Sequence, residues 1–152
     1  AAVAPHIAGD APGGLDVVVA ADIADVLAPG THAHERGAVG VAMLDVSWCG
    51  GLSEAKKIAT LAEAYQLPVA PHDCTGPVVL VASTHLSINA PNALIQESVR
   101  AYYTGWYKEL VTALPTIADG FIAPPPGPGL GTELLPDLDQ RPDAHRRFSD
   151  AT

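Results

Sequence analysis

The chain has 152 residues, of which 48% are hydrophobic and 16% are charged, and its formal net charge is −9. This composition is typical of one globular domain with a real core and argues against an intrinsically disordered chain. The acidic balance leaves no basic face for phosphates, so we expect no nucleic-acid partner. No apolar run reaches the roughly 18 residues that a membrane-spanning helix needs, so we expect no membrane partner.

Cysteine content and the amino terminus predict the compartment. Cys49 and Cys74 are too few for a disulfide scaffold, which favours a reducing environment. The amino terminus shows no charged segment followed by an apolar stretch, so it does not resemble a signal peptide. We therefore expect a cytoplasmic protein.

Residues 1–35 contain no Lys or Arg and follow no regular pattern over most of their length. The apolar run 15–21 predicts a buried strand that ends at Asp22. His32 and His34 lie near Glu35, a grouping that could bind a metal, although two exposed loop histidines are the simpler interpretation.

From Arg36 onward, short apolar runs alternate with longer segments. Three of these runs, 40–44, 67–71 and 92–96, lead directly to Asp45, His72 and Glu97, which stand 27 and 25 residues apart. Each step accommodates one strand, one helix and two loops, which predicts βαβ units and a parallel sheet. Because the carboxyl ends of parallel strands lie at one edge of the sheet, the three polar side chains should lie close together in one site.

The segments between and after these runs predict helices. Residues 54–65 form one helix with Ser53 as its N-cap, and Pro77 suits the first position of the next, which is apolar nearly all round over 78–86. Residues 102–114 predict an amphipathic helix, 119–131 an extended segment with turns, and 137–152 a polar tail. The first helix should face the sheet with Ala55, Ile58, Ala59, Ala62 and Tyr65.

Asp45, His72 and Glu97 are the candidate catalytic residues. An imidazole beside a carboxylate is a standard acid/base device, because the carboxylate fixes the tautomer and stabilises the imidazolium. A capping Asp, a loop His and a surface Glu would give the same spacing without chemistry. Spacing alone therefore leaves both interpretations open.

Two other chemistries could use the same segment. His72 and Cys74 with Cys49 could bind zinc, although three ligands without a tight Cys-x-x-Cys pattern make a weak motif. Cys74 could be a nucleophile activated by His72, but no oxyanion hole is evident. Otherwise the two cysteines are small buried residues.

Four sequence motifs, occurring in a fixed order, resemble those of a known family. They are Asp45-Val-Ser-Trp-Cys-Gly50-Gly51, Ala70-Pro71-His72 followed by Gly76-Pro77, Gln96-Glu97, and Pro126-Gly127-Pro128-Gly129-Leu130-Gly131. Together they resemble the carboxyl-terminal barrel half of the mandelate racemase and muconate lactonizing branch of the enolase superfamily. The Pro-His-x-x-x-Gly-Pro form is most similar to acid-sugar dehydratases of the galactonate type.

The resemblance implies an α/β fold, a partial (β/α)7β TIM-like barrel running from strand five or six to strand eight, with a carboxyl-terminal tail. Residues 36–136 would be the carboxyl-terminal part of the barrel domain, and 1–35 a poorly matched segment with a possible strand-five remnant. It also implies Asp45 and His72 as the acid/base dyad and Glu97 as a helper that holds an anionic intermediate.

The resemblance further implies one Mg²⁺, which stabilises the enediolate formed when a proton leaves the carbon alpha to a substrate carboxylate. The family's metal carboxylates on its third and fourth strands have no counterpart here. Asp22 is a weak candidate for the fifth-strand ligand, and Asp10 is its rival by wording.

The expected partner is a small sugar acid that loses water, and the complete protein is expected to be a homo-oligomer. Two alternatives stay open: a non-catalytic half-barrel remnant, and a racemase or cycloisomerase on the same scaffold.

Overall fold

The computed structural model describes residues 17–19 and 40–145. Its centre is a parallel sheet in the order β1-β2-β3, formed by Val17–Val19, Val41–Asp45 and Val69–His72. The expected parallel sheet is therefore confirmed, and the strand predicted from the run 15–21 is present over Val17–Val19. Its expected end at Asp22 lies outside the described residues. β2 and β3 are buried along nearly their whole length, as expected for strands covered on both faces.

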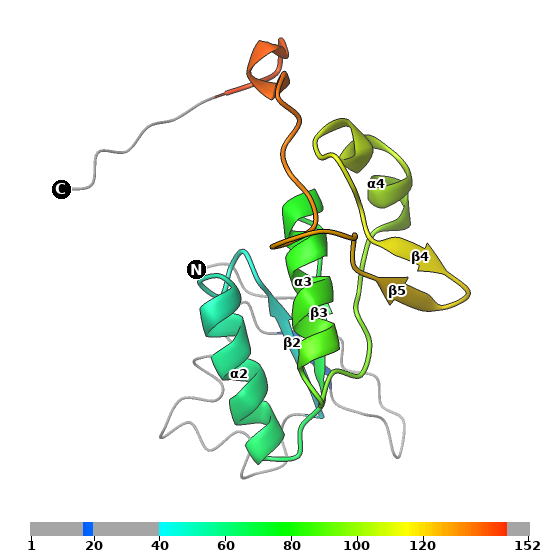
Figure 1. The fold of residues 1–152 in the computed structure, drawn as a ribbon. Coiled ribbons are helices and arrows are strands. Elements are labelled where there is room, and N and C mark those ends of the chain that lie inside the picture. The colour runs from blue at the N-terminus through cyan, green and yellow to red at the C-terminus, as the bar shows by residue number, and fades with distance from the viewer. Residues whose placement is uncertain (1–16, 20–39, 146–152) are drawn as a thin grey trace, which may run out of the picture.

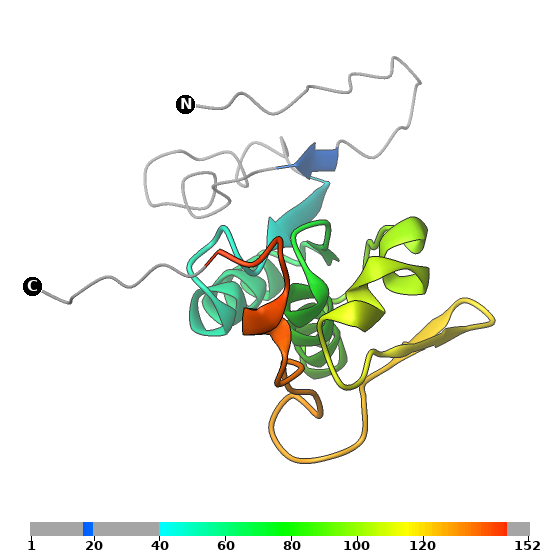
Figure 2. The same ribbon diagram turned by 90° about the horizontal axis from the view of Figure 1, so that it is seen from above.

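Two helices of 13 residues, α2 (Leu52–Ala64) and α3 (Pro77–Asn89), lie side by side on the same side of this sheet (Figures 1 and 2). α2 follows β2 and α3 follows β3, so the chain repeats strand and helix as the spacing predicted. No helix among the described residues is long and apolar enough to cross a membrane.

The core lies between the sheet and α2, and it also takes in one side of α3. It consists of small and medium apolar side chains, with the partly buried Cys49 packed against it. Its buried members are Ala42, Leu44, Val46, Ala55, Ile58, Ala59, Ala62, Val69, Ala82, Leu86 and Ala90.

The prediction for α2 was right for its buried face and wrong at both ends. Tyr65 is the C-cap and is 44% exposed, so it does not face the sheet. The N-cap is Gly51 rather than Ser53, and α2 begins one residue earlier than Ser53. Gly51 has a φ of 93°, which glycine adopts without strain because it has no Cβ. Glycine at this position therefore allows the backbone to turn into the helix.

The third apolar run, 92–96, does not form a full strand. Residues 92–97 run beside β3 through one parallel bridge, Val69 to Ala93, and through backbone hydrogen bonds from Leu94 to Val69 and from Glu97 to Pro71 (2.9 Å each). These bonds still bring Glu97 to the carboxyl end of β3.

The predicted helix over 102–114 was wrong. The chain forms α4 (Arg100–Thr104), breaks at Gly105 and continues as the 3-10 helix η1 (Trp106–Glu109). A Cβ at Gly105 would lie 2.6 Å from the carbonyl oxygen of Ala101, so only glycine fits this break.

The predicted extended segment over 119–131 includes the second strand of a hairpin that the sequence did not reveal. β4 (Thr116–Ala118) and β5 (Phe121–Ala123) are antiparallel, and they lie beyond α3 on the side away from α2 (Figure 1). A short 3-10 helix, η2 (Leu138–Gln140), follows.

Candidate active site

Asp45 and His72 end neighbouring strands at the same level. Asp45 is the last residue of β2, His72 is the last residue of β3, and the two are partners in the register of the parallel pair. Their side chains therefore leave the same edge of the sheet, as the strand-end pattern requires.

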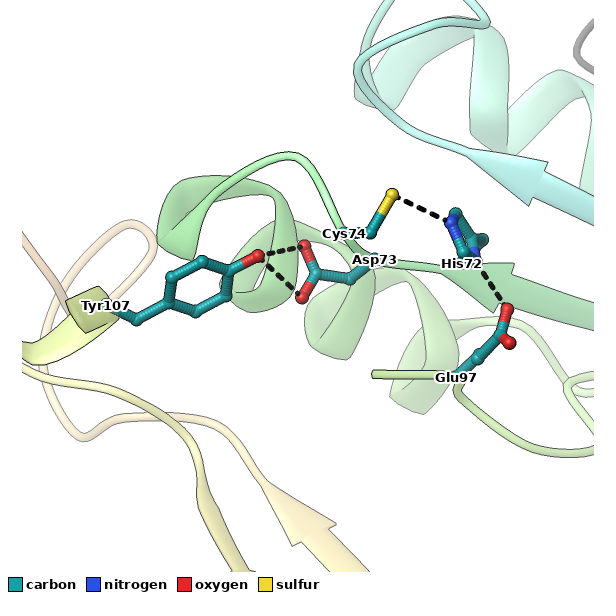
Figure 3. A network of polar contacts seen from close by, with 5 residues as sticks. All are labelled: His72, Asp73, Cys74, Glu97 and Tyr107. Carbon is teal, nitrogen blue, oxygen red and sulfur yellow. Dashed lines mark hydrogen bonds and ion pairs between the residues drawn. The ribbon is translucent and has the colours of Figure 1, made fainter. Parts of the chain in front are cut away.

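The ring of His72 lies between two polar side chains, as Figure 3 shows. Its Nδ1 contacts the Glu97 carboxylate, and its Nε2 lies 3.1 Å from Sγ of Cys74. An ionised carboxylate can only accept a hydrogen bond, so Nδ1 is the donor in this contact, and in a neutral ring Nε2 then carries the lone pair. Two of the three candidate residues, His72 and Glu97, are thus in direct contact.

Asp45 is 7% exposed, and only one of its two carboxylate oxygens has a hydrogen-bond partner among the described residues. Its Oδ1 accepts hydrogen bonds from the backbone N–H (2.7 Å) and the hydroxyl (2.6 Å) of Ser47. Its Oδ2 is buried and has no hydrogen-bond partner among the described residues. The Ser47 hydroxyl also lies 3.1 Å from that of Thr75, which ties the loop after β2 to the loop after β3.

Asp45 approaches the ring without a direct bond. One of its carboxylate oxygens, a ring nitrogen of His72 and Sγ of Cys74 all lie within 4.8 Å of one another. Among the hydrogen bonds between described residues, none joins Asp45 to His72; the ring contact is made by Glu97 instead.

A buried pair that the sequence did not indicate involves Asp73, the residue directly after His72. Asp73 and Tyr107 are both fully buried, and the tyrosine hydroxyl donates to both carboxylate oxygens, at 3.4 and 3.3 Å (Figure 3). No spacing pattern connects residues 34 positions apart in the loop after β3 and in a 3-10 helix. The only signal was that Asp73 directly follows His72.

Burial governs the acid–base properties of the groups around the ring. It raises the pKa of Asp73 to about 6, against the opposing hydrogen bonds from the Gly76 backbone and Tyr107. Burial, and then the neighbouring Asp73 charge, raise the pKa of Tyr107. Burial and the charges of Asp45, Asp73 and Glu97 also raise the pKa of the Cys74 thiol.

The described donor set does not fit magnesium. Mg²⁺ takes oxygen ligands in an octahedral arrangement, whereas Asp45, His72 and Cys74 offer one carboxylate, one imidazole and one thiol. Asp22, the weak candidate ligand, lies outside the described residues, as do Asp10, His32, His34 and Glu35. Cys49, the third residue of the zinc alternative, points its thiol at the carbonyl oxygens of Val46 and Gly51 and is not in the group.

These features define the class: an α/β protein with acid and base side chains gathered at the carboxyl edge of a parallel sheet, where α/β enzymes carry their chemistry. Residues 6–138 match the family described as Enolase C-terminal domain-like, and the chain belongs to that family. The resemblance inferred from the four motifs is confirmed.

Named relatives and solved structures agree with this assignment. The chain is 37% identical over 105 residues to a D-galactonate dehydratase of Ralstonia pickettii, covering 66% of this chain and 28% of that protein. It is 38% identical over 105 residues to a D-xylonate dehydratase of Haloferax volcanii, covering 69% and 25%. An enolase of the mandelate racemase subgroup from Agrobacterium tumefaciens shares 70% identity at a TM-score of 0.65, covering 70% of this chain and 29% of that one.

The chain therefore spans between a quarter and three tenths of the length of these relatives. The activities in their names belong to proteins that contain much more than the segment matched here.

Proposed function

We propose that this chain is the carboxyl-terminal barrel part of an acid-sugar dehydratase, with β1 as barrel strand five, β2 and β3 as strands six and seven, and residues 92–97 as strand eight. The observation that carries the proposal is the convergence of Asp45, His72 and Glu97 at one sheet edge. The dehydratases among the relatives supply the substrate class, a small sugar acid.

His72 is the proposed base. Because Glu97 holds the proton on Nδ1, the lone pair of Nε2 takes the proton from the carbon alpha to the substrate carboxylate. The resulting imidazolium has the Glu97 carboxylate against it and the buried Asp45 carboxylate nearby. This changes one detail of the expected dyad, since the carboxylate that contacts the ring is Glu97.

The same imidazolium completes the elimination. It returns its proton to the departing 3-hydroxyl, so that the C3–O bond breaks, water leaves and neutral His72 is regenerated. The remaining enol tautomerises to a 2-keto-3-deoxy acid. The side chain of Glu97 is 47% exposed, so it is accessible to the substrate as well as to His72.

A chimaera tests this function, because the chain alone spans 28% of the R. pickettii relative. The matching segment of that dehydratase is replaced by this chain, and D-galactonate is supplied with Mg²⁺. We expect formation of the 2-keto-3-deoxy acid, and we expect His72→Asn in the chimaera to lower kcat by about 10²-fold or more, since general acid–base catalysis contributes that much. Substrate binding, measured by calorimetry, should persist.

The control variant is His85→Asn, because His85 lies in α3 and binds the carbonyl oxygen of Leu130 (3.0 Å), away from the cluster. It should retain turnover. Equal activity of the His72→Asn and unsubstituted chimaeras would refute the role of His72. Exchange of the alpha proton with solvent without loss of water would identify racemase chemistry and contradict the dehydratase proposal.

A further inference from the structure

Three different metal-binding atoms converge at the sheet edge. A carboxylate oxygen of Asp45, a ring nitrogen of His72 and Sγ of Cys74 lie within 4.8 Å of one another, and they come from the ends of two adjacent strands and the loop after β3. The proposed proton transfers use His72 and the carboxylates, but they give Cys74 no role. The position of the Cys74 thiol beside His72 is therefore not explained by the proposed reaction.

The His72 ring is already oriented as in a metal site. Histidines that bind a metal commonly donate their other N–H to a carboxylate, which fixes the tautomer and raises the ligand's basicity. Glu97 contacts Nδ1 in this way, and Nε2 faces Sγ of Cys74 at 3.1 Å, as Figure 3 shows. Around a tetrahedral zinc ion, a bound imidazole nitrogen and thiolate sulfur lie about 3.5 Å apart, so a small adjustment suffices.

The second, independent observation is the free oxygen of Asp45. The side chain is 7% exposed, and its Oδ2 is buried without a hydrogen-bond partner among the described residues. A buried polar atom without a partner is costly, and a bound cation removes that cost. The carboxylates of Asp45, Asp73 and Glu97 lie around the thiol and add negative charge there, which favours binding of a cation.

We propose that Asp45, His72 and Cys74 form a binding site for a thiophilic divalent cation of the zinc type, with Glu97 orienting the imidazole. The soft thiolate and the imidazole select zinc or cobalt over magnesium. Three protein ligands leave the fourth tetrahedral position open to water or substrate. The bound ion takes the Nε2 lone pair, so it inhibits proton abstraction; that consequence alone rests on the proposed function.

Cobalt reports the thiolate ligand directly. Co²⁺ alone is titrated into the full 152-residue chain, and we expect the near-ultraviolet charge-transfer band of a cobalt–thiolate bond, abolished by addition of equimolar Zn²⁺. Cys74→Ser should abolish the band, whereas Cys49→Ser, which changes the other free cysteine, should leave it unchanged. Glu97→Gln should weaken Zn²⁺ binding by about 10- to 100-fold, the usual effect of losing an orienting partner.

Alkylation of the unsubstituted chain gives a second readout that needs no variant to fold. Zn²⁺ should protect Cys74 from iodoacetamide, as followed by peptide mass spectrometry, while Cys49 stays equally reactive and Mg²⁺ gives no protection. A band that persists in Cys74→Ser, or equal protection of Cys74 by Mg²⁺ and Zn²⁺, would overturn the proposal. These measurements detect binding only, so they are independent of whether the chain supports dehydration.

Discussion

Asp73 is fully buried although it directly follows the histidine at the sheet edge. Its partner is the hydroxyl of Tyr107, at 3.3 and 3.4 Å, and Tyr107 in turn packs edge-on against Trp106. The pair therefore fastens η1 to the loop that begins right after His72. Asp73 lies one residue from the proposed base, so the protonation state of its carboxyl group affects the stability of the site.

The raised pKa of Asp73, about 6 against an ordinary value of 3.8, predicts how stability changes with pH. Between those two values the folded chain holds a proton that the unfolded chain has released, so the free energy of unfolding falls as pH rises from about 4 to 6. The loss is at most about 3 kcal/mol. Urea unfolding of Asp73→Asn, which cannot ionise, should show a smaller loss between pH 4 and 7 than the unsubstituted chain shows.

Asp137→Asn, a change at an exposed aspartate, is the matched control and should keep the full pH dependence. If Asp73→Asn and the unsubstituted chain lose stability in parallel over this range, Asp73 does not titrate with a raised pKa.

At the scale of elements, sequence periodicity predicted those features of helices and strands that depend on neighbouring residues. The buried face of α2, the start of α3 at Pro77 and the strand ends at Asp45 and His72 follow from apolar spacing and proline preference, and all are present. The break at Gly105 was missed because the sequence does not show that the Ala101 carbonyl closes off the Cβ position. Long-range pairings such as Asp73 with Tyr107 have no periodic signal at all.

The position of Glu97 depends on an element contact that spacing does not reveal. Gln96 donates from Nε2 to the Leu80 carbonyl oxygen (3.1 Å) and to the Thr84 hydroxyl oxygen (3.2 Å), both on the buried side of α3. The next residue, Glu97, donates its backbone N–H to the Pro71 carbonyl oxygen at 2.9 Å. Gln96 therefore anchors the 92–97 segment to α3 just before the residue that contacts His72.

Gln96→Ala should loosen this segment without unfolding the chain. Each lost hydrogen bond is worth about 0.5–1.5 kcal/mol, so hydrogen exchange at the Glu97 amide should become about tenfold faster or more. Amide exchange followed by NMR measures it. Ser98→Ala, two residues further along, should leave the Glu97 rate unchanged. Equal rates in the unsubstituted chain and Gln96→Ala would show that α3 does not anchor the segment.

At the scale of the whole molecule, the described residues leave an apolar face exposed. Ile88, Leu94, Ile95 and Phe121 are 60%, 56%, 62% and 78% exposed, and all line one hollow of about 400 Å³ between α3, the 92–97 segment and the β4–β5 hairpin. Single exposed apolar residues are ordinary, whereas a cluster of this kind marks a surface that associates. The homo-oligomer expected for the complete protein stays a prediction. Self-association of this chain through the apolar face can be tested directly.

Sedimentation velocity should show the 152-residue chain associating as its concentration rises. Removing one fully covered isoleucine from such a contact costs about 1.5–3 kcal/mol, so Ile95→Lys should weaken association by about 10- to 100-fold. Leu134→Lys changes an equally exposed leucine outside the hollow and should not weaken it. A chain that stays monomeric at every concentration, or that responds equally to both lysines, would show that this face does not drive association.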